Sequence, residues 1–572
     1  MAEALSSVNE LMSDSVSLMK QHAATLVAVL FLAPVVVGVS GAFLPAFGYI
    51  PELGHHEFSL NAWRHLIETP GLAKMLALTL TSGVGATLLS LILAFSFVSA
   101  AWNKRWWRQA ERWLSPILAA PHVAYAVGFS FLIMPGGMLA RMLASLTGWT
   151  SPPGWETVQD PAGISLMLIL ALKEAPFLVL MLMAAVNQIP VNDSLRTGLA
   201  LGYQPWMVWV KIIWPQLYKR IRFSLLTVLV FSLSVVDIAI VMGPSTPPTF
   251  AVQVLNWFRN PDLDFQSLAS AGSLLLMLIV LTAISVLYLV EKGAGHISGW
   301  LTNGHRGRLG EVWNRIAVLS WKVTVISFAG SVLMLLVWSF AWRWRFPSLS
   351  PEKWSFRSWE RAWPQLSEPL WNSLIIGLVS AALGVVIAIL LLEAGKRTNK
   401  LLSRLMYLPL LLPQLTFLFG IQVWMIRLDV EGYWFSVVFM HLLFVLPYCY
   451  LSLSGPWRYY DDRHSKQAWL LSGSRVKAFV QVKSRVLLKP VLASFALGFA
   501  VSIAQYLPTV FAGAGRVTTV TTETVALAAS GNRRLIGVYA LVQMLLPLLI
   551  YALFTFMGRW QLREWKLSRR FI

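Results

Sequence analysis

The segment "SLRTGLALGYQPWMVWVKIIWP", residues 194–215, separates two long apolar stretches of the chain. It mixes polar and apolar side chains. Leu195, Leu199 and Tyr203 recur at intervals of four, which places them along one face of a short helix. Gly202 directly precedes Tyr203, and a glycine readily ends a helix because it adopts a left-handed backbone conformation. The pattern predicts either an interfacial helix lying on a membrane or a helix that docks on a partner.

The composition around this segment is typical of a membrane protein. Of the 572 residues, 57% are hydrophobic and 13% are charged, whereas about a quarter of the residues in a soluble domain are charged. Many windows of 18 or more residues contain almost no charge, which predicts membrane-spanning helices. We expect an all-α protein with twelve spans, at about residues 23–48, 72–100, 113–136, 163–189, 220–243, 268–291, 317–341, 369–393, 402–426, 433–455, 487–512 and 535–557.

The net charge of +20 is interpreted as a topology signal and not as a sign of nucleic acid binding. Most Lys and Arg residues lie in short loops on one side of the predicted spans, as expected for the cytoplasmic side. This bias predicts a multi-pass protein of the bacterial inner membrane with both termini in the cytoplasm. The loop 342–368 is an exception, because its five basic residues fall on the predicted outer side.

Proline and glycine positions recur in the same order in both parts of the chain. The recurring pairs are Pro121 with Pro413, Gly128 with Gly420, Pro176 with Pro447, Gly202 with Gly473, and Asp237 with Gln505. An internal repeat of six spans gives both copies the same orientation. We therefore expect two parallel halves, residues 1–300 and 301–572, joined by a polar, glycine-rich connector.

The opening segment has a counterpart in the second half, "DRHSKQAWLLSGSRVKAFVQVKSRVLLKP". Both resemble the E-A-A-x-x-x-G-x₉-I-x-L-P loop of binding-protein-dependent ABC importer permeases. Gly202, Ile212 and Pro215 match that spacing, and Ala468 and Gly473 match its first part. Arg196 and Gln467 stand where that family has glutamate.

The resemblance implies a type I ABC importer permease fold and two coupling loops, at 190–216 and 461–490. Its twelve-span layout is similar to the fused permeases of the ferric-iron and thiamine group, and residues 505–534 most resemble the Ynj-type permease. The positions that the resemblance assigns to ATPase coupling are Arg196, Leu199, Ala200, Gly202, Tyr203, Gln467, Ala468, Leu471 and Gly473.

The partners implied by the resemblance are an ABC ATPase homodimer on the cytoplasmic face and a periplasmic binding protein that delivers a small solute. The sequence contains no G-x-x-x-x-G-K-[ST] phosphate loop. We therefore expect a transport subunit and not an enzyme, with no cofactor of its own and with ATP–Mg bound by the partner. The consecutive residues His55, His56 and Glu57 have poor geometry for a metal, and Cys449 is the single cysteine, so no metal site is predicted.

Ionisable residues within spans are costly and often line a solute path. Lys173, Glu174 and Asp237 fall in the fourth and fifth predicted spans, and Gln505 and Tyr506 fall in the eleventh. We expect Asp237, Gln505 and Tyr506 to line a path between the halves, with Lys173 and Glu174 as further candidates for it. The alternative is that neighbouring helices satisfy these groups and that they serve packing alone, and this alternative applies most to Lys173 and Glu174.

Two other classes of protein compete with this interpretation. A secondary, ion-coupled transporter can also consist of two parallel six-span halves. The loop "AWNKRWWRQAER" lacks the G-x-x-x-D-R-x-G-R pattern of the largest such family. A membrane-embedded enzyme or receptor would need polar groups converging at one depth, and the sequence offers few. Dependence on an ATPase subunit separates the importer hypothesis from both alternatives.

Overall fold

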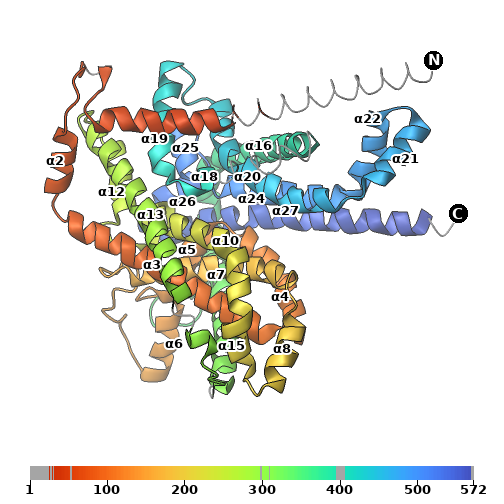
Figure 1. Ribbon diagram of the computed structural model, residues 1–572. Coiled ribbons are helices and arrows are strands. Elements are labelled where there is room, and N and C mark those ends of the chain that lie inside the picture. The colour runs from red at the N-terminus through yellow and green to blue at the C-terminus, as the bar shows by residue number, and fades with distance from the viewer. Residues whose placement is uncertain are drawn as a thin grey trace, which may run out of the picture.

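Helices account for nearly all of the secondary structure in the computed structural model (Figure 1). In the described part of the chain, the two strands β1 (Ala341–Arg343) and β2 (Lys353–Trp354) pair as a small antiparallel hairpin. Parts of the predicted first and ninth spans lie outside the described residues. The structure describes residues 31–51, 54–296, 299–307, 310–393 and 408–568, together with Thr25, Val29 and Met406.

The chain forms two series of helices that are joined by the long helix α15 (Gly310–Phe340). Before α15 come a helix at Phe31–Ala46 and then α2 (Asn61–Glu68), α3 (Leu72–Ala101), α4 (Arg105–Ala119), α5 (His122–Ile133), α6 (Met138–Thr147), α7 (Ile164–Val186), α8 (Val191–Ala200), α9 (Pro205–Val208), η2 (Trp209–Ile213), α10 (Trp214–Ser234), α11 (Asp237–Met242), α12 (Phe250–Phe258), α13 (Phe265–His296) and α14 (Gly299–Thr302). After it come α16 (Arg357–Glu393), α18 (Leu408–Leu411), α19 (Gln414–Arg427), α20 (Trp434–Tyr459), α21 (Asp462–Ser472), α22 (Arg475–Ala478), η3 (Phe479–Lys483), α23 (Ser484–Val486), α24 (Leu488–Ile503), α25 (Leu507–Gly513), α26 (Val520–Ala528) and α27 (Arg533–Ser568).

Each of the twelve predicted apolar stretches contains helix, but not every stretch is one long helix. In the described residues, eight helices are long and apolar enough to cross a membrane, or nine if a pair bent by 73° at Leu487 counts as one span. The other three stretches hold the shorter helix at Phe31–Ala46 and two interrupted helices, α10–α11 and α18–α19. The short described helix of the first stretch and the breaks in the fifth and ninth stretches together account for the difference from the predicted count.

Equivalent contacts occur in the two series. Helix α3 packs on α7 and α10, as α16 packs on α20 and α24, and the short helices α12 and α26 lie against α13 and α27 respectively. The first N–H of each short helix is bonded to a hydroxyl of a long one. Thr79 Oγ1 accepts from Phe250 N and Ser373 Oγ accepts from Val520 N, each at 2.9 Å. These hydroxyls satisfy helix-start donors that would otherwise lack partners.

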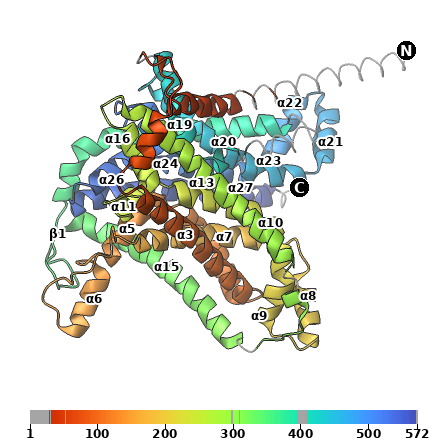
Figure 2. The same cartoon turned by 60° about the vertical axis from the view of Figure 1, so that its left-hand side comes forward.

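Two helices pack across the two series, namely α15 and the helix Phe31–Ala46. Helix α15 packs along α5 and α3 on its way from the α8–α9 loop to β1 (Figure 2). A Cβ on Gly128 of α5 would lie 2.6 Å from the Ser331 carbonyl oxygen of α15. A Cβ on Gly420 of α19 would lie 1.9 Å from the Gly38 carbonyl oxygen of the helix Phe31–Ala46. Two repeat glycines thus permit the close helix crossings that tie the series together.

Candidate functional site

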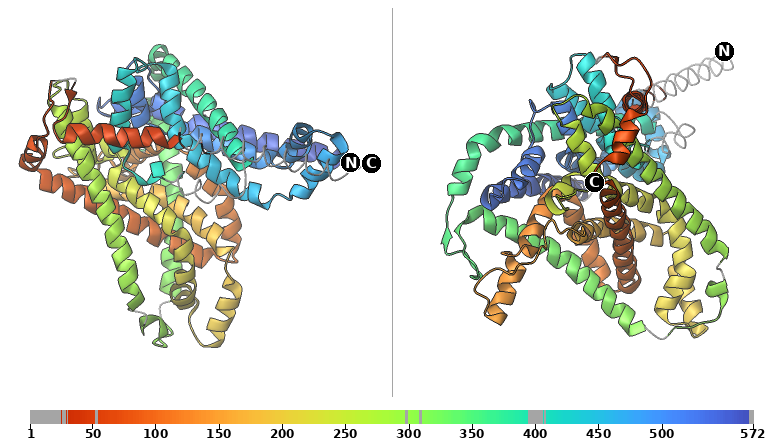
Figure 3. Two further views of the ribbon diagram at one scale, coloured as in Figure 1. Left: turned by 45° about the horizontal axis from the view of Figure 1, so that its top comes forward. Right: turned by 90° about the vertical axis from the view of Figure 1, so that its left-hand side faces the viewer.

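The two predicted coupling loops share one architecture. Each has a short helix, α8 or α21, then a glycine, then a four-residue helix that continues into a π-helical turn, η2 or η3. Gly202 has φ +81° and Gly473 has φ +66°, values that glycine adopts at little cost. The loops lie on two diverging arms at one side of the molecule (Figures 1 and 3).

Leucine side chains project from both loops. Leu199 is 50% exposed on the first loop, and Leu471 is 89% exposed on the second. The other predicted coupling residues lie on the same surfaces: Arg196, Ala200, Gly202, Gln467 and Gly473 are exposed, and Tyr203 and Ala468 are half-buried. Exposed leucines beside charged side chains are typical of a surface that another protein covers.

The connector that precedes α15 packs against the first loop. Lys211 Nζ donates to Asn303 Oδ1 at 2.6 Å, and Gln204 N donates to the Arg306 carbonyl oxygen at 3.0 Å. Gly307 lies against Trp206, and a Cβ built on Gly307 would be 2.9 Å from the indole ring. The connector therefore holds the first loop in place.

The second loop has a different support. In α21 no residue is buried, and nothing lies within 4 Å of a Cβ built on Gly473. Its anchor lies further along the chain, where Lys483 forms an ion pair with Glu393 at the end of α16. Trp457 Nε1 donates to the same carboxylate at 3.0 Å. The two loops are thus alike in shape but not in their surroundings.

The predicted path residues lie where two long helices break. Helix α10 ends at Ser234 and α11 begins at Asp237, while α24 ends at Ile503 and α25 begins at Leu507. Asp237 Oδ1 accepts from Ile238 N at 2.9 Å. The side chain of Gln505, in the second break, is 9% exposed. Broken helices expose backbone groups that can face a polar path.

One cluster joins the two breaks. The Tyr506 side chain lies near Arg259 and within electrostatic range of Asp237. Tyr506 itself is 6% exposed, while Arg259 at the end of α12 is exposed. The structure therefore brings Asp237 and Tyr506 together from different series.

The chain is similar in sequence to known membrane proteins. The chain is 34% identical over 503 residues to the inner membrane ABC transporter permease protein YnjC of Escherichia coli (strain K12), covering 88% of this chain and 91% of that protein. The chain belongs to the ABC transporter permeases. It is also 26% identical over 146 residues to the alpha-glucoside transport system permease protein AglF of Rhizobium meliloti (strain 1021), covering 25% of this chain and 43% of that protein. No family model matches the chain.

These similarities confirm several predictions made from sequence. The permease is a multi-pass, all-α protein of the inner membrane and serves as a transport subunit of an ABC importer. The role of each individual path or coupling residue stays a prediction.

Lys173 of the permease has a structural partner. Its Nζ donates to the carbonyl oxygens of Ile117 and Ala120, at 3.0 and 2.7 Å. These carbonyls lie at the end of α4, where Pro121 interrupts the helix. A lysine at a helix C-terminus satisfies free carbonyls and favours the negative end of the helix dipole. Lys173 thus stabilises the break between α4 and α5 by bonding the free carbonyl groups at the end of α4.

Glu174 faces a different neighbour. His122 Nδ1 lies 3.9 Å from Glu174 Oε1, and the Glu174 side chain is 10% exposed. Glu174 also acts electrostatically on Tyr448, the residue after Pro447 in α20. Lys173 and Glu174 therefore point to different places, as their adjacency predicts, and Glu174 is the one near both series.

Sequence reasoning missed His441 and Arg259. His441 of α20 bridges the break between α24 and α25, with Nδ1 2.7 Å from Ser502 Oγ and Nε2 2.8 Å from Thr509 Oγ1. A histidine in an apolar span is a visible signal, because intramembrane ionisable residues are costly. Arg259 gave no such signal, since it follows a short helix outside the predicted spans.

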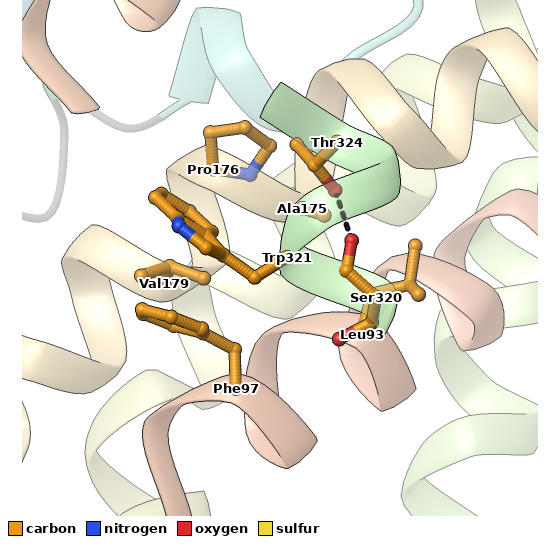
Figure 4. A pocket seen from close by; sticks show the side chains of 8 residues that line it. All are labelled: Leu93, Phe97, Ala175, Pro176, Val179, Ser320, Trp321 and Thr324. Atoms are coloured by element: carbon orange, nitrogen blue, oxygen red, sulfur yellow. Dashed lines mark hydrogen bonds between the residues drawn. The ribbon is translucent and has the colours of Figure 1, made fainter. Parts of the chain in front are cut away.

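A small cavity beside Pro176 lies where α3, α7 and α15 meet (Figure 4). Its volume of about 10 Å³ is close to the least that holds one water. Mainly apolar side chains line it, including Phe97, Val179 and Trp321. The cavity is a packing gap beside the helix proline and is too small for a transported solute.

Proposed function

We propose that residues 1–300 and 301–572 of this permease form the two halves of a translocation path for a small solute. A periplasmic binding protein delivers the solute, and an ATPase homodimer that binds ATP–Mg docks on the cytoplasmic loops 190–216 and 461–490. Both termini then lie in the cytoplasm. The observation that carries the proposal is the pair of matching loops, each with exposed leucines beside a positive-φ glycine, at one side of the molecule.

The proposed mechanism is alternating access. ATP binding closes the ATPase dimer and draws α8 and α21 together, so that the halves pivot about the crossings at Gly128 and Gly420. Hydrolysis resets the halves and releases solute on the cytoplasmic side. Because linkage is reciprocal, a binding protein that prefers the outward state must also favour ATP binding.

The path is proposed to run past the two helix breaks. Asp237, Gln505 and Tyr506 would contact solute there, with Arg259 at the outer end and Glu174 nearer the coupling loops. Asp237 and Arg259 supply opposite charges around Tyr506. This favours a small polar organic solute over a bare cation, which Arg259 would repel. A thiamine-like solute fits this arrangement, because its positive charge would face Asp237 and its polar groups would face Arg259.

The test is co-purification with the ATPase of the same transport system. The double variant Leu199→Asp with Leu471→Asp puts a charge on each exposed leucine and should abolish ATPase binding. Leu146→Asp is the matched control, since Leu146 is 83% exposed on α6 and lies away from both loops. All variants should insert and elute as the wild type does.

The outcome also decides against the main rival. Loss of the ATPase in the double variant alone supports docking through these loops. If wild type binds no ATPase, the importer mechanism fails for this chain. Transport that follows a proton or sodium gradient would then assign it to secondary transport.

A further inference from the structure

Three arginines surround one tryptophan at the end of the molecule opposite the coupling loops. Their guanidinium carbons lie 5.3, 5.1 and 5.3 Å from the Trp342 ring centroid, for Arg357, Arg361 and Arg534 respectively. The three therefore lie no more than about 11 Å from one another, because each is within 5.3 Å of the same centroid. A ring attracts each cation through its face, but it does not cancel the repulsion between the cations.

The carboxylate of the hairpin does not pair with the three arginines of this cluster. Glu352 pairs with Arg343, with Nε and Oε2 3.2 Å apart. Among the residues that the structure describes, no carboxylate forms an ion pair with Arg357, Arg361 or Arg534. Arg534 instead donates Nε to the Ala341 carbonyl oxygen at 3.2 Å. An anion from outside the chain would stabilise the three charges.

The cluster is held in a defined shape. Buried Arg141 of α6 donates Nη1 to the carbonyl oxygens of Arg345 and Ser348, at 2.7 and 2.6 Å, and lies over the Trp344 ring. These contacts anchor the turn of the β1–β2 hairpin that presents Trp342. The start of the 37-residue helix α16 adds a partial positive charge at Arg357.

The cluster adjoins the ends of two predicted spans, because Trp342 follows the span 317–341 and Arg534 precedes the span 535–557, and we therefore expect it near the membrane surface. Ala362 and Leu366 of α16 pack with Val538 and Tyr539 near the start of the apolar part of α27. Arg361 directly precedes Ala362 and Arg534 lies one turn before Val538, and both approach Trp342. Large aromatic side chains beside them are exposed: Trp354 by 54%, Phe356 by 69% and Trp363 by 58%. Exposed aromatic side chains at this level are typical of the boundary between lipid and water.

The β1–β2 hairpin lies at the rim of the molecule, between the outer ends of α15 and α16 (Figures 2 and 3). A solute-delivering protein must cover the central path, whereas the rim faces bilayer lipid. We propose that Arg357, Arg361 and Arg534 around Trp342 bind the phosphate headgroup of an anionic phospholipid, in the leaflet opposite the coupling loops. Basic pockets between membrane helices recognise such headgroups. This also gives a role to two of the five basic residues of loop 342–368 on the predicted outer side, Arg357 and Arg361.

The test measures lipid retained by the purified full-length chain, using native mass spectrometry in detergent with phosphatidylglycerol and zwitterionic phosphatidylethanolamine as probes. Wild type should retain phosphatidylglycerol preferentially. Each cation should contribute about fivefold to this retention, so Arg357→Gln with Arg361→Gln should weaken it by about 25-fold. Arg343→Gln is the matched control, because it removes a cation of the same loop that already has a carboxylate partner.

The result can also overturn the proposal. Equal retention of the two lipids by wild type, or unchanged retention by the double variant, would do so. A double variant that keeps its lipid but no longer binds the periplasmic binding protein would assign the cluster to that partner. If the double variant does not fold, Arg357→Lys with Arg361→Lys is measured instead. It keeps both charges but lacks the paired hydrogen bonds of the guanidinium, so it should still prefer phosphatidylglycerol but retain it more weakly than wild type does.

Discussion

The main chains of Gly41 and Gly420 touch, since a Cβ on Gly41 would lie 2.8 Å from Gly420 Cα. The contact joins the first described helix to α19 of the second series. At the equivalent crossing, Gly128 of α5 meets Ser331 of α15. Two close helix crossings therefore join the two series of helices, one at Gly420 and one at Gly128, and the glycines make these crossings possible.

Alanine at either crossing should destabilise the permease. Gly420→Ala and Gly128→Ala each force the backbones apart, and overpacking of this kind costs about 1–3 kcal/mol. Thermal unfolding in detergent measures the change. Gly455→Ala is the control, because Gly455 lies in α20 with nothing within 4 Å of its Cβ position. An equal melting temperature for Gly420→Ala and Gly455→Ala would show that the crossing tolerates separation.

The hydroxyls that cap α12 and α26 should contribute to stability. Thr79→Val and Ser373→Ala each leave a helix-start N–H without its partner, which costs about 1 kcal/mol. We expect the double variant to lose roughly the sum, since the two caps lie in separate series. Thr81→Val is the control, because the Thr81 hydroxyl donates only within α3, to the carbonyl oxygens of Ala77 and Leu78. Hydrogen exchange at Phe250 and Val520 gives a local measurement, and unchanged protection there contradicts the prediction.

Lys173 should matter for stability more than for solute contact. Lys173→Met removes two hydrogen bonds to the end of α4, and a hydrogen bond to a charged group contributes about 1.5–3 kcal/mol. The melting temperature should fall, while the remaining folded protein keeps binding-protein-stimulated ATPase activity. Lys322→Met is the matched control, since Lys322 of α15 is exposed. Full stability with lost stimulation would instead place Lys173 in the solute path.

The connector should support the first coupling loop. Gly307→Ala puts a Cβ 2.9 Å from Trp206, whereas Gly304→Ala meets nothing within 4 Å. Both glycines have positive φ, +80° and +69°, so the backbone strain of the two variants is similar. Trypsin should cleave after Arg306 faster in Gly307→Ala alone, and ATPase co-purification should weaken. Equal cleavage of the two variants would show that the connector does not depend on Trp206.

The cluster at the helix breaks should affect coupling without affecting assembly. Tyr506→Phe removes the hydroxyl beside Arg259, and we expect stimulated ATPase activity to fall by about tenfold, which corresponds to the upper end of the free energy of one hydrogen bond. The ATPase should still co-purify. Tyr433→Phe serves as the control, because Tyr433 is 49% exposed at the start of α20. Normal activity of Tyr506→Phe would remove Tyr506 from the proposed path.

Much of this site could be predicted from local pattern. The loops around Gly202 and Gly473 were recognisable because glycine and the flanking polar residues recur at fixed spacing, and local spacing specifies a short helix and its end. Asp237 and Tyr506 were recognisable because polar residues in apolar spans are costly. Their proximity required the two series to be placed side by side.

The sequence by itself determined that this chain spans a membrane as helices, because long uncharged stretches have no other way to satisfy their backbone in lipid. It also determined where the loops and repeats lie. Only the tertiary structure decided that Gly128 and Gly420 face crossing helices, that Lys173 caps α4, and that three arginines gather around Trp342. Each of these depends on residues far apart in the chain, and packing between distant helices leaves no periodic signal in either segment.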